Sequence, residues 1–195
     1  MEILSLALTF FIVANPIGNS PTILSLLRHY PFERQRIIMF RESVISLLIA
    51  LFFLFFGEMF LNALHISRYS LVLTGGIVLF LLALKMIFHS SGPAEADQTK
   101  QEPFIVPIAT PMISGAGLMT VIMVNAAAEH NNIKIFFAIL IAWIGVTGVL
   151  VTSPYIQKLI GRNGMAALEQ IMGMILGLIS MNMIVDALRL FVQTQ

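Results

Sequence analysis

Charged residues are scarce in this sequence, and cysteine is absent. Only 11% of the 195 residues are Asp, Glu, Lys or Arg, while 58% are hydrophobic and the mean hydropathy is +0.92. Soluble domains carry about 25% charged residues, so this composition excludes a water-soluble domain and indicates a membrane protein. The lack of cysteine excludes disulfides, thiolate zinc sites and thiol redox motifs.

A large net charge is also missing. The net charge is +1 and the basic residues are scattered, so we expect no nucleic-acid partner. The N-terminus, Met1-Glu2-Ile3, has no basic segment or cleavage site and predicts an uncleaved first span. We expect neither an enzyme nor a bound cofactor, because all four histidines fall at span ends or in connectors: His29, His65, His89 and His130.

Long apolar runs divide the chain into six segments that could cross a bilayer. A helix needs ~20 mostly apolar residues to span about 30 Å of hydrocarbon. Unpaired backbone groups are costly in lipid, so all six spans should be helical and the fold all-α. The predicted spans cover residues 3–27, 37–62, 69–89, 104–128, 133–155 and 166–190.

The first and fourth spans are each interrupted near the middle by proline, glycine and small polar residues. The first contains Asn15-Pro16-Ile17-Gly18-Asn19-Ser20-Pro21, and the fourth contains Thr110-Pro111-Met112-Ile113-Ser114-Gly115-Ala116-Gly117. Proline removes a backbone donor and clashes with the preceding turn, and glycine tolerates unwound dihedral angles. We therefore expect both spans to be broken into two half-helices.

The two halves of the chain look like copies of each other. A shift of 95 residues lays Ala14-Asn15-Pro16-Ile17 on Ala109-Thr110-Pro111-Met112, and places the second span on the fifth and the third on the sixth. Three spans per half is an odd number, so the second copy must enter the membrane from the opposite side. We predict an inverted repeat with residues 1–89 as the first unit, 90–102 as a polar linker, and 103–195 as the second unit.

The distribution of lysine and arginine predicts the orientation. Eight of these residues flank the first, third and fifth connectors, and three lie on the other side. Cytoplasmic loops carry the excess of positive charge. Both termini are therefore predicted to face outward and the 90–102 linker to face the cytoplasm.

Broken helices at matching repeat positions are typical of midplane binding sites in secondary transporters. Unwound turns free amide and carbonyl groups, and each half-helix end adds a partial charge of about half a unit. The alternative is that both prolines mark kinks that neighbouring helices repair. The candidate solute-binding residues are Asn15, Gly18, Asn19, Ser20, Thr110, Ser114, Gly115 and Gly117.

Ionisable groups inside a membrane are functional candidates because their burial is expensive. Glu42 and Glu169 each lie about one turn inside a span, on the predicted cytoplasmic side. They are candidates for coupling to a proton or sodium ion. The simpler alternative for Arg41 is a structural role as the partner of an acidic residue.

Small residues on the third and sixth spans indicate close helix packing. Gly173 and Gly177 form a small-xxx-small pattern, and Gly75-Gly76 lies in the matching region of the third span. Such patterns let two membrane helices approach closely. We expect these to be packing surfaces within the monomer.

The interrupted spans resemble those of the MarC family of six-span membrane proteins. The resemblance covers nearly the whole chain and rests on Asn15–Pro21, on Glu102-Pro103-Phe104-Ile105-Val106-Pro107 before Pro111, and on Ala167-Leu168-Glu169 through Gly173 to Asp186 and Arg189. It implies a cytoplasmic-membrane protein related to ion-coupled transporters of small neutral amino acids. The sequence departs from the family in having Gly115-Ala116-Gly117 where members often have Gly-Pro.

The function predicted from these features is secondary transport of small polar solutes, in particular small neutral amino acids, across the bilayer. The alternative from another class is a non-transporting membrane scaffold or regulatory protein whose breaks serve only packing. A channel is a third possibility, although the sequence carries no ring of charges or carbonyl-filter motif. A homo-oligomer is compatible with each of these.

Overall fold

The computed structural model describes residues 2–88, 103–129 and 132–193, and these residues are almost entirely helical. The predicted 90–102 linker, His89 and His130 lie outside the described residues. The helical elements are α1 (Ile3–Ala14), α2 (Pro16–Leu26), α3 (Phe32–Ala63), α4 (Arg68–Phe88), the π-helical η1 (Ile108–Ile113), α5 (Ala116–Glu129) and α6 (Asn132–Gln193). The all-α prediction is confirmed.

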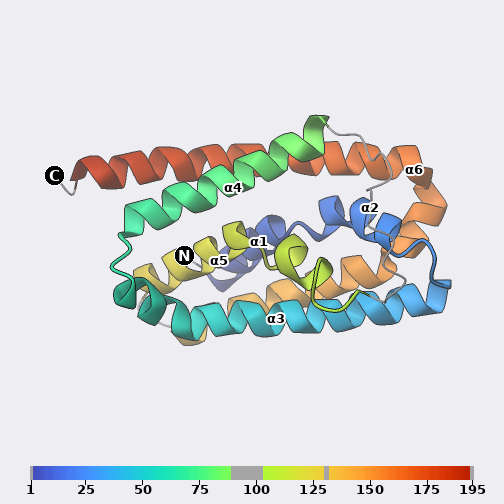
Figure 1. The fold of residues 1–195 in the computed structure, drawn as a ribbon, viewed down its shortest axis with the longest axis horizontal. Coiled ribbons are helices and arrows are strands. Elements are labelled where there is room, and N and C mark those ends of the chain that lie inside the picture. Colours follow the sequence, from blue (N-terminus) through green and yellow to red (C-terminus); the bar gives the residue numbers. More distant parts are fainter. Residues whose placement is uncertain (1, 89–102, 130–131, 194–195) are drawn as a thin grey trace.

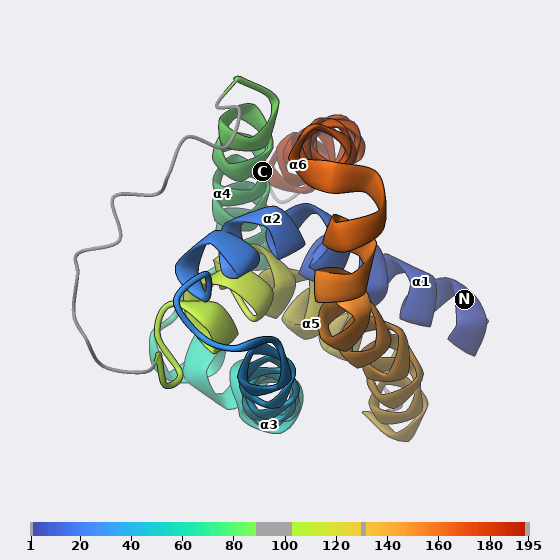
Figure 2. The same cartoon turned by 90° about the vertical axis from the view of Figure 1, so that its right-hand side faces the viewer.

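The long helices form two outer layers around the short ones. A kink at Gly161 divides α6 into an N-terminal and a C-terminal arm. In Figure 1, α4 runs beside the C-terminal arm along one side, and α3 runs beside the N-terminal arm along the other. The end view in Figure 2 places α2, α5 and the end of α1 between these two pairs, while the N-terminal part of α1 reaches the edge of the bundle. The short, interrupted elements therefore lie in the interior of the bundle.

Lipid is the solvent that this surface requires. Many large apolar side chains are exposed on the outer helices, among them Leu178 and Ile144 at 75% each. Four helical stretches are long and apolar enough to cross a membrane, namely Ile3–Leu26, α3, α4 and α6. A shorter apolar helix covers Ala116–Ala128. Continuous apolar exposure of this kind is unstable in water, so the chain is an integral membrane protein.

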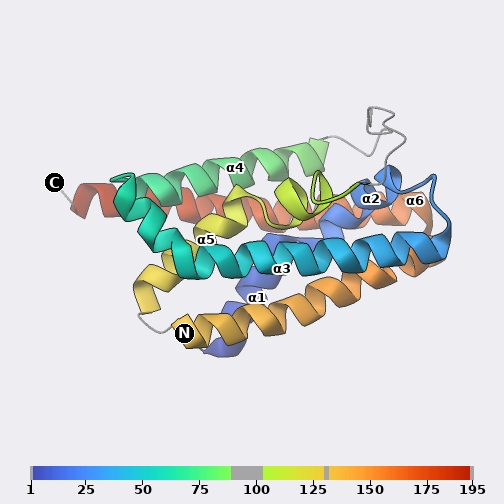
Figure 3. The same ribbon diagram turned by 60° about the horizontal axis from the view of Figure 1, so that its bottom comes forward.

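The last long element differs from the sequence prediction, because residues 156–165 do not form a loop. They are helical except at Gly161, where φ is +71° and ψ is −178°. Glycine has no Cβ and adopts this positive φ readily. The polar residues around Gly161 suggested a connector, and the helix is interrupted there at Gly161 itself. The kink divides α6 into two arms, each long enough to cross the hydrocarbon, in agreement with two predicted spans. Figure 3 shows the bend at the end opposite the C-terminus.

The break in the first span is confirmed. α1 ends at Ala14, and Asn15 adopts the left-handed conformation with φ 51° and ψ 49°. Pro16 is the first residue of α2, where its missing N–H is harmless because the first amides of a helix have no intrahelical partner. Asparagine is among the few residues that tolerate this conformation. The break therefore occurs one residue before the proline.

The fourth span is also broken, but it begins later than predicted. Residues 103–107 are not helical, which corrects the start predicted at residue 104. Thr110 has an extended backbone with φ −136° and ψ 130°, and α5 starts only at Ala116. Pro107 and Pro111 fall in this stretch, and residues that precede proline are disfavoured in helical conformation. The predicted Pro/Gly interruption is confirmed.

Glycines predicted to be packing surfaces within the monomer lie where α4 contacts α6. A Cβ built on Gly76 would lie 3.2 Å from the carbonyl oxygen of Ser180 on α6. A Cβ on Gly173 would lie 3.2 Å from the carbonyl oxygen of Ala83 on α4. Both glycines thus allow the two backbones to approach more closely than any side chain would permit.

Candidate functional site

The two interrupted segments meet inside the bundle. We call residues 15–20 and 110–117 the junction. The side-chain amide of Asn19, which is 5% exposed, donates to the carbonyl oxygen of Ala14 at 3.2 Å and to that of Met112 at 2.7 Å. One side chain therefore ties the end of α1 to the turn of η1, although Asn19 and Met112 are 93 residues apart in sequence.

Asn15 holds the first break with both ends of its amide. Its Oδ1 accepts from the backbone N–H of Gly18 at 3.2 Å, which caps the N-terminus of α2. Its Nδ2 donates to the sulfur of Met86 on α4 at 3.2 Å. A thioether is a weak acceptor, so this second bond is easily exchanged for a better one.

The hydroxyl groups of the junction differ in their partners. Ser20 donates to the carbonyl oxygen of Pro16 at 2.6 Å, within its own helix. Ser114 donates to the carbonyl oxygen of Ser46 on α3 at 2.8 Å, which anchors the second break to α3. Thr110 Oγ1 is enclosed and has no hydrogen-bond partner among the described residues. An enclosed hydroxyl without a partner costs free energy unless something else binds it.

Glycines bring both half-helix starts against one face of α4. A Cβ on Gly18 would lie 2.2 Å from Met86 Cε, and a Cβ on Gly117 would lie 2.3 Å from Leu79 Cγ. Leu79 and Met86 are two turns apart on α4, about 10 Å. The N-terminal ends of α2 and α5 therefore abut α4 at neighbouring positions. Gly115 is confined instead by the carbonyl oxygen of Pro111, 2.5 Å from its Cβ position.

Glu42 fastens the segment that leads into the second break. Its carboxylate is fully buried and accepts two hydrogen bonds, one from Arg41 Nη2 at 2.8 Å and one from the backbone N–H of Ile105 at 3.0 Å. Arg41 also donates to the carbonyl oxygen of Pro103. The carbonyl oxygen of Ile105 in turn accepts from the N–H of Thr110 at 3.0 Å. The structure thus identifies Glu42 as the acidic partner of Arg41, and this ion pair is connected to the junction.

Glu169 lies on the face of α6 that packs against α4. It is 7% exposed and lies four residues before Gly173, so the two share a helix face. Gly173 packs against Met86, where its Cβ position is 2.9 Å from the methionine Cβ. Glu169 is thus about one turn away from the methionine that covers the first break.

A polar network on α3 and α6 was missed by the sequence predictions. Trp143 Nε1 donates to the carbonyl oxygen of Ser43 at 2.9 Å and to Ser46 Oγ at 3.1 Å, while the hydroxyls of Ser43 and Thr147 share a bond of 2.6 Å. Because Ser114 donates to Ser46, this network continues into the junction. The helical spacing of Ser43 with Ser46 and of Trp143 with Thr147 could have indicated two facing polar stripes.

The chemistry that the junction offers is hydrogen bonding without formal charge. Residues 15–20 and 110–117 contain amide, hydroxyl and backbone groups and no ionisable side chain. Such a set can hold a neutral or zwitterionic solute, with its anionic end toward the helix N-termini.

Comparison with known proteins agrees with this architecture. Residues 1–192 match the MarC family, described as MarC family integral membrane protein. The UPF0056 inner membrane protein YhgN of Escherichia coli K12 is 38% identical, covering 98% of each chain. A UPF0056 membrane protein of Buchnera aphidicola from Acyrthosiphon pisum is 34% identical over 96% of each, and one of Chlamydia pneumoniae is 30% identical over 95% of this chain and 93% of its own. No solved structure matches. The chain therefore belongs to the MarC family of integral membrane proteins.

Proposed function

We propose that this protein is a secondary transporter of small polar solutes, specifically small neutral amino acids, in the cytoplasmic (inner) membrane. The observation that carries the proposal is the double hydrogen bond of Asn19 to Ala14 and Met112, which brings two interrupted helices together in the bundle interior. Packing alone does not require polar, unwound backbone there, because continuous apolar helices satisfy their own hydrogen bonds.

The solute would be held by complementary partial charges. Its carboxylate would approach the N-terminal amides of α2 and α5, and its ammonium group would face unwound carbonyls and the hydroxyl of Thr110. Thr110 Oγ1 supports this arrangement because it is enclosed and lacks a partner among the described residues.

Entry of a solute would require Met86 to move. Its methyl group occupies the space beside Gly18, and its sulfur accepts a hydrogen bond from Asn15 Nδ2. Methionine side chains are flexible, and a carboxylate is a stronger acceptor than a thioether. An arriving carboxylate would therefore replace Met86 as the partner of Asn15.

Alternating access would follow from an inverted repeat of residues 1–89 and 103–195, with both termini outside and the linker in the cytoplasm. Glu42 supports coupling to a proton or sodium ion, because its carboxylate is joined through Ile105 to Thr110. Glu169 is the second coupling candidate, given its place beside the Met86 contact.

The proposal is tested by uptake into liposomes that contain the purified protein. Labelled glycine, alanine and serine are offered with and without a proton or sodium gradient, and we expect saturable, gradient-dependent uptake of at least one. Asn15→Ala should reduce this uptake at least tenfold, because it removes both the cap of α2 and a solute-facing amide. The matched control is Asn125→Ala, whose amide donates to the carbonyl oxygen of Val121 in its own helix.

The other candidate functions give different results in the same preparation. Currents that rise without saturation as solute concentration increases would indicate a channel. A defined partner that co-purifies with a protein showing no flux of any solute would indicate a scaffold. Equal uptake by wild type and Asn15→Ala would remove the first break from the mechanism.

A further inference from the structure

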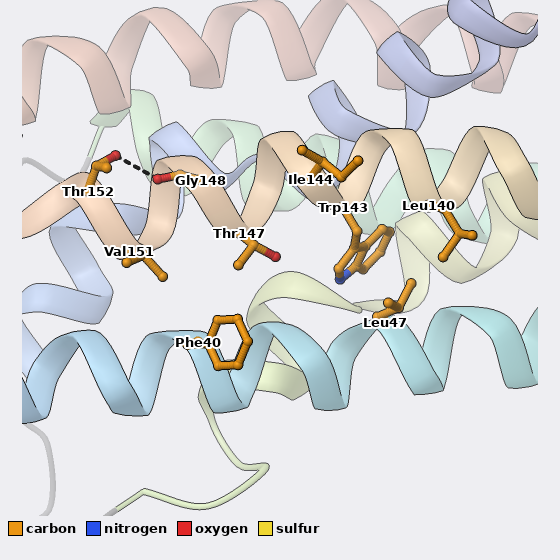
Figure 4. A pocket seen from close by; sticks show the side chains of 9 residues that line it. All are labelled: Phe40, Leu47, Leu140, Trp143, Ile144, Thr147, Gly148, Val151 and Thr152. Atoms are coloured by element: carbon orange, nitrogen blue, oxygen red, sulfur yellow. Dashed lines mark hydrogen bonds between the residues drawn. The ribbon is translucent and has the colours of Figure 1, made fainter.

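An apolar groove runs along the outer face of the bundle between α3 and the N-terminal arm of α6. Its volume is about 640 Å³. Figure 4 shows the side chains that line it, including Phe40 and Leu47 from α3 and Trp143, Ile144, Gly148 and Val151 from α6. From Leu140 to Thr152 the groove follows α6 for about 18 Å. That length is close to the ~15 Å hydrocarbon depth of one membrane leaflet.

The polar groups along this groove are already engaged with the protein. Thr152 donates to the carbonyl oxygen of Gly148 at 2.6 Å, the dashed line in Figure 4. Thr147 bonds to Ser43, and the indole N–H of Trp143 is directed to Ser43 and Ser46. The groove therefore offers apolar surface to its occupant and no free hydrogen-bonding group from these residues.

One end of the groove opens into a second hollow that is lined in part by the positively charged side chain of Arg36. This hollow has a volume of about 360 Å³, shares Phe40 and Val151 with the groove, and adds Glu33, Arg36 and Ile37. Arg36 Nη1 donates to the hydroxyl of Tyr155 at 3.2 Å, and the guanidinium lies over the Tyr155 ring at 5.4 Å. Arg36 Nε has no hydrogen-bond partner among the described residues. The Nε atom is enclosed, but the Arg36 side chain as a whole is 36% exposed, so an acceptor from outside can reach the guanidinium.

We propose that this face binds one anionic phospholipid, with an acyl chain in the groove and its phosphate at Arg36. Guanidinium groups bind phosphate oxygens well, and basic pockets between membrane helices bind lipid headgroups. Glu33 lies 3.7 Å from Arg36, but its side chain is 79% exposed and this contact is weak. A second copy of the chain fits less well, because its apolar helix would cover the guanidinium without supplying an acceptor.

The test is native mass spectrometry of the delipidated protein in detergent, with three probes. These are phosphatidylglycerol, diacylglycerol with the same chains, and inorganic phosphate. We expect one phosphatidylglycerol to bind more tightly than either of the other two. Arg36→Gln should weaken it about fivefold, the contribution typical of one basic residue at a membrane surface. Arg189→Gln, at an exposed arginine on the other arm of α6, should leave binding unchanged.

A second variant tests the acyl chain separately from the charge. A Cβ on Gly148 meets no atom within 4 Å, so Gly148→Leu fills the groove without a clash inside the protein. It should weaken phosphatidylglycerol and diacylglycerol alike, while Ala167→Leu, on the exposed face of the other arm, should not. Inorganic phosphate binding as tightly as the lipid, unaltered lipid binding to both variants, or a change confined to the oligomeric state with Gly148→Leu would each overturn the proposal.

Discussion

Replacing Asn19 by leucine should lower the free energy of unfolding by about 3 kcal/mol, because two buried carbonyls lose their donor and each such loss costs about 1–3 kcal/mol. Leucine matches asparagine roughly in size but donates nothing to Ala14 or Met112. For a chain of this length, the midpoint of thermal unfolding should fall by roughly 6–12 °C. The measurement is thermal unfolding of the purified protein in detergent.

The control for this experiment is Asn182→Leu. Asn182 is exposed on α6 and bonds only to Asp186 of the same helix, at 3.2 Å. Its replacement should change the midpoint by less than about 2 °C, because surface substitutions usually alter stability by no more than about 0.5 kcal/mol. Equal shifts for the two variants would mean that Asn19 does not hold the two breaks together.

Glu42→Leu should be similarly destabilising, by about 3 kcal/mol. It leaves the guanidinium of Arg41 and the N–H of Ile105 without their buried acceptor. Removing one member of a buried ion pair costs about 3–5 kcal/mol, and the low end applies here because the Arg41 side chain is 32% exposed. Unfolding in detergent, compared with wild type, gives the value.

A double substitution separates the pair from the packing. Arg41→Met combined with Glu42→Leu removes both charges, and it should recover part of the stability lost with Glu42→Leu alone. A double variant that is less stable by the sum of both single effects would contradict the pairing. Glu42→Gln keeps the side-chain shape, so loss of gradient dependence in its uptake would assign the coupling role to the charge itself.

Much of the fold could be predicted from local chemistry. Pro16 with Asn15, and Pro111 with the small residues after it, interrupt otherwise apolar spans, and both breaks occur in the structure. Gly76 and Gly173 were predicted to be packing surfaces within the monomer, and in the structure both lie where α4 contacts α6. These features depend on backbone sterics within a few residues, which is why one sequence was sufficient to predict them.

The remaining features depend on contacts between distant segments. Residues 103–107 form a non-helical turn, in which Val106 N–H donates to the carbonyl oxygen of Phe104. This turn is fastened by Arg41 and Glu42, which are more than 60 residues away. No local pattern contains that anchor, so the segment was predicted to be helical. Similarly, the meeting of Trp143 with Ser43 and Ser46 depends on how α6 lies against α3. The sequence shows which side chains are polar but not which of them face each other.

The most direct test of a solute site at the junction is protection of an introduced thiol. The chain has no cysteine, so Thr110→Cys carries a single reactive group at the enclosed hydroxyl position. A thiolate reacts with a water-soluble reagent only when water reaches it, which requires the junction to open. The transport account predicts slow labelling in liposomes that is slowed at least fivefold further by the transported amino acid, while labelling of Asn163→Cys at the α6 bend is unaffected. A labelling rate at Thr110→Cys that no solute changes, or complete inertness of that thiol while Asn163→Cys reacts, would contradict it.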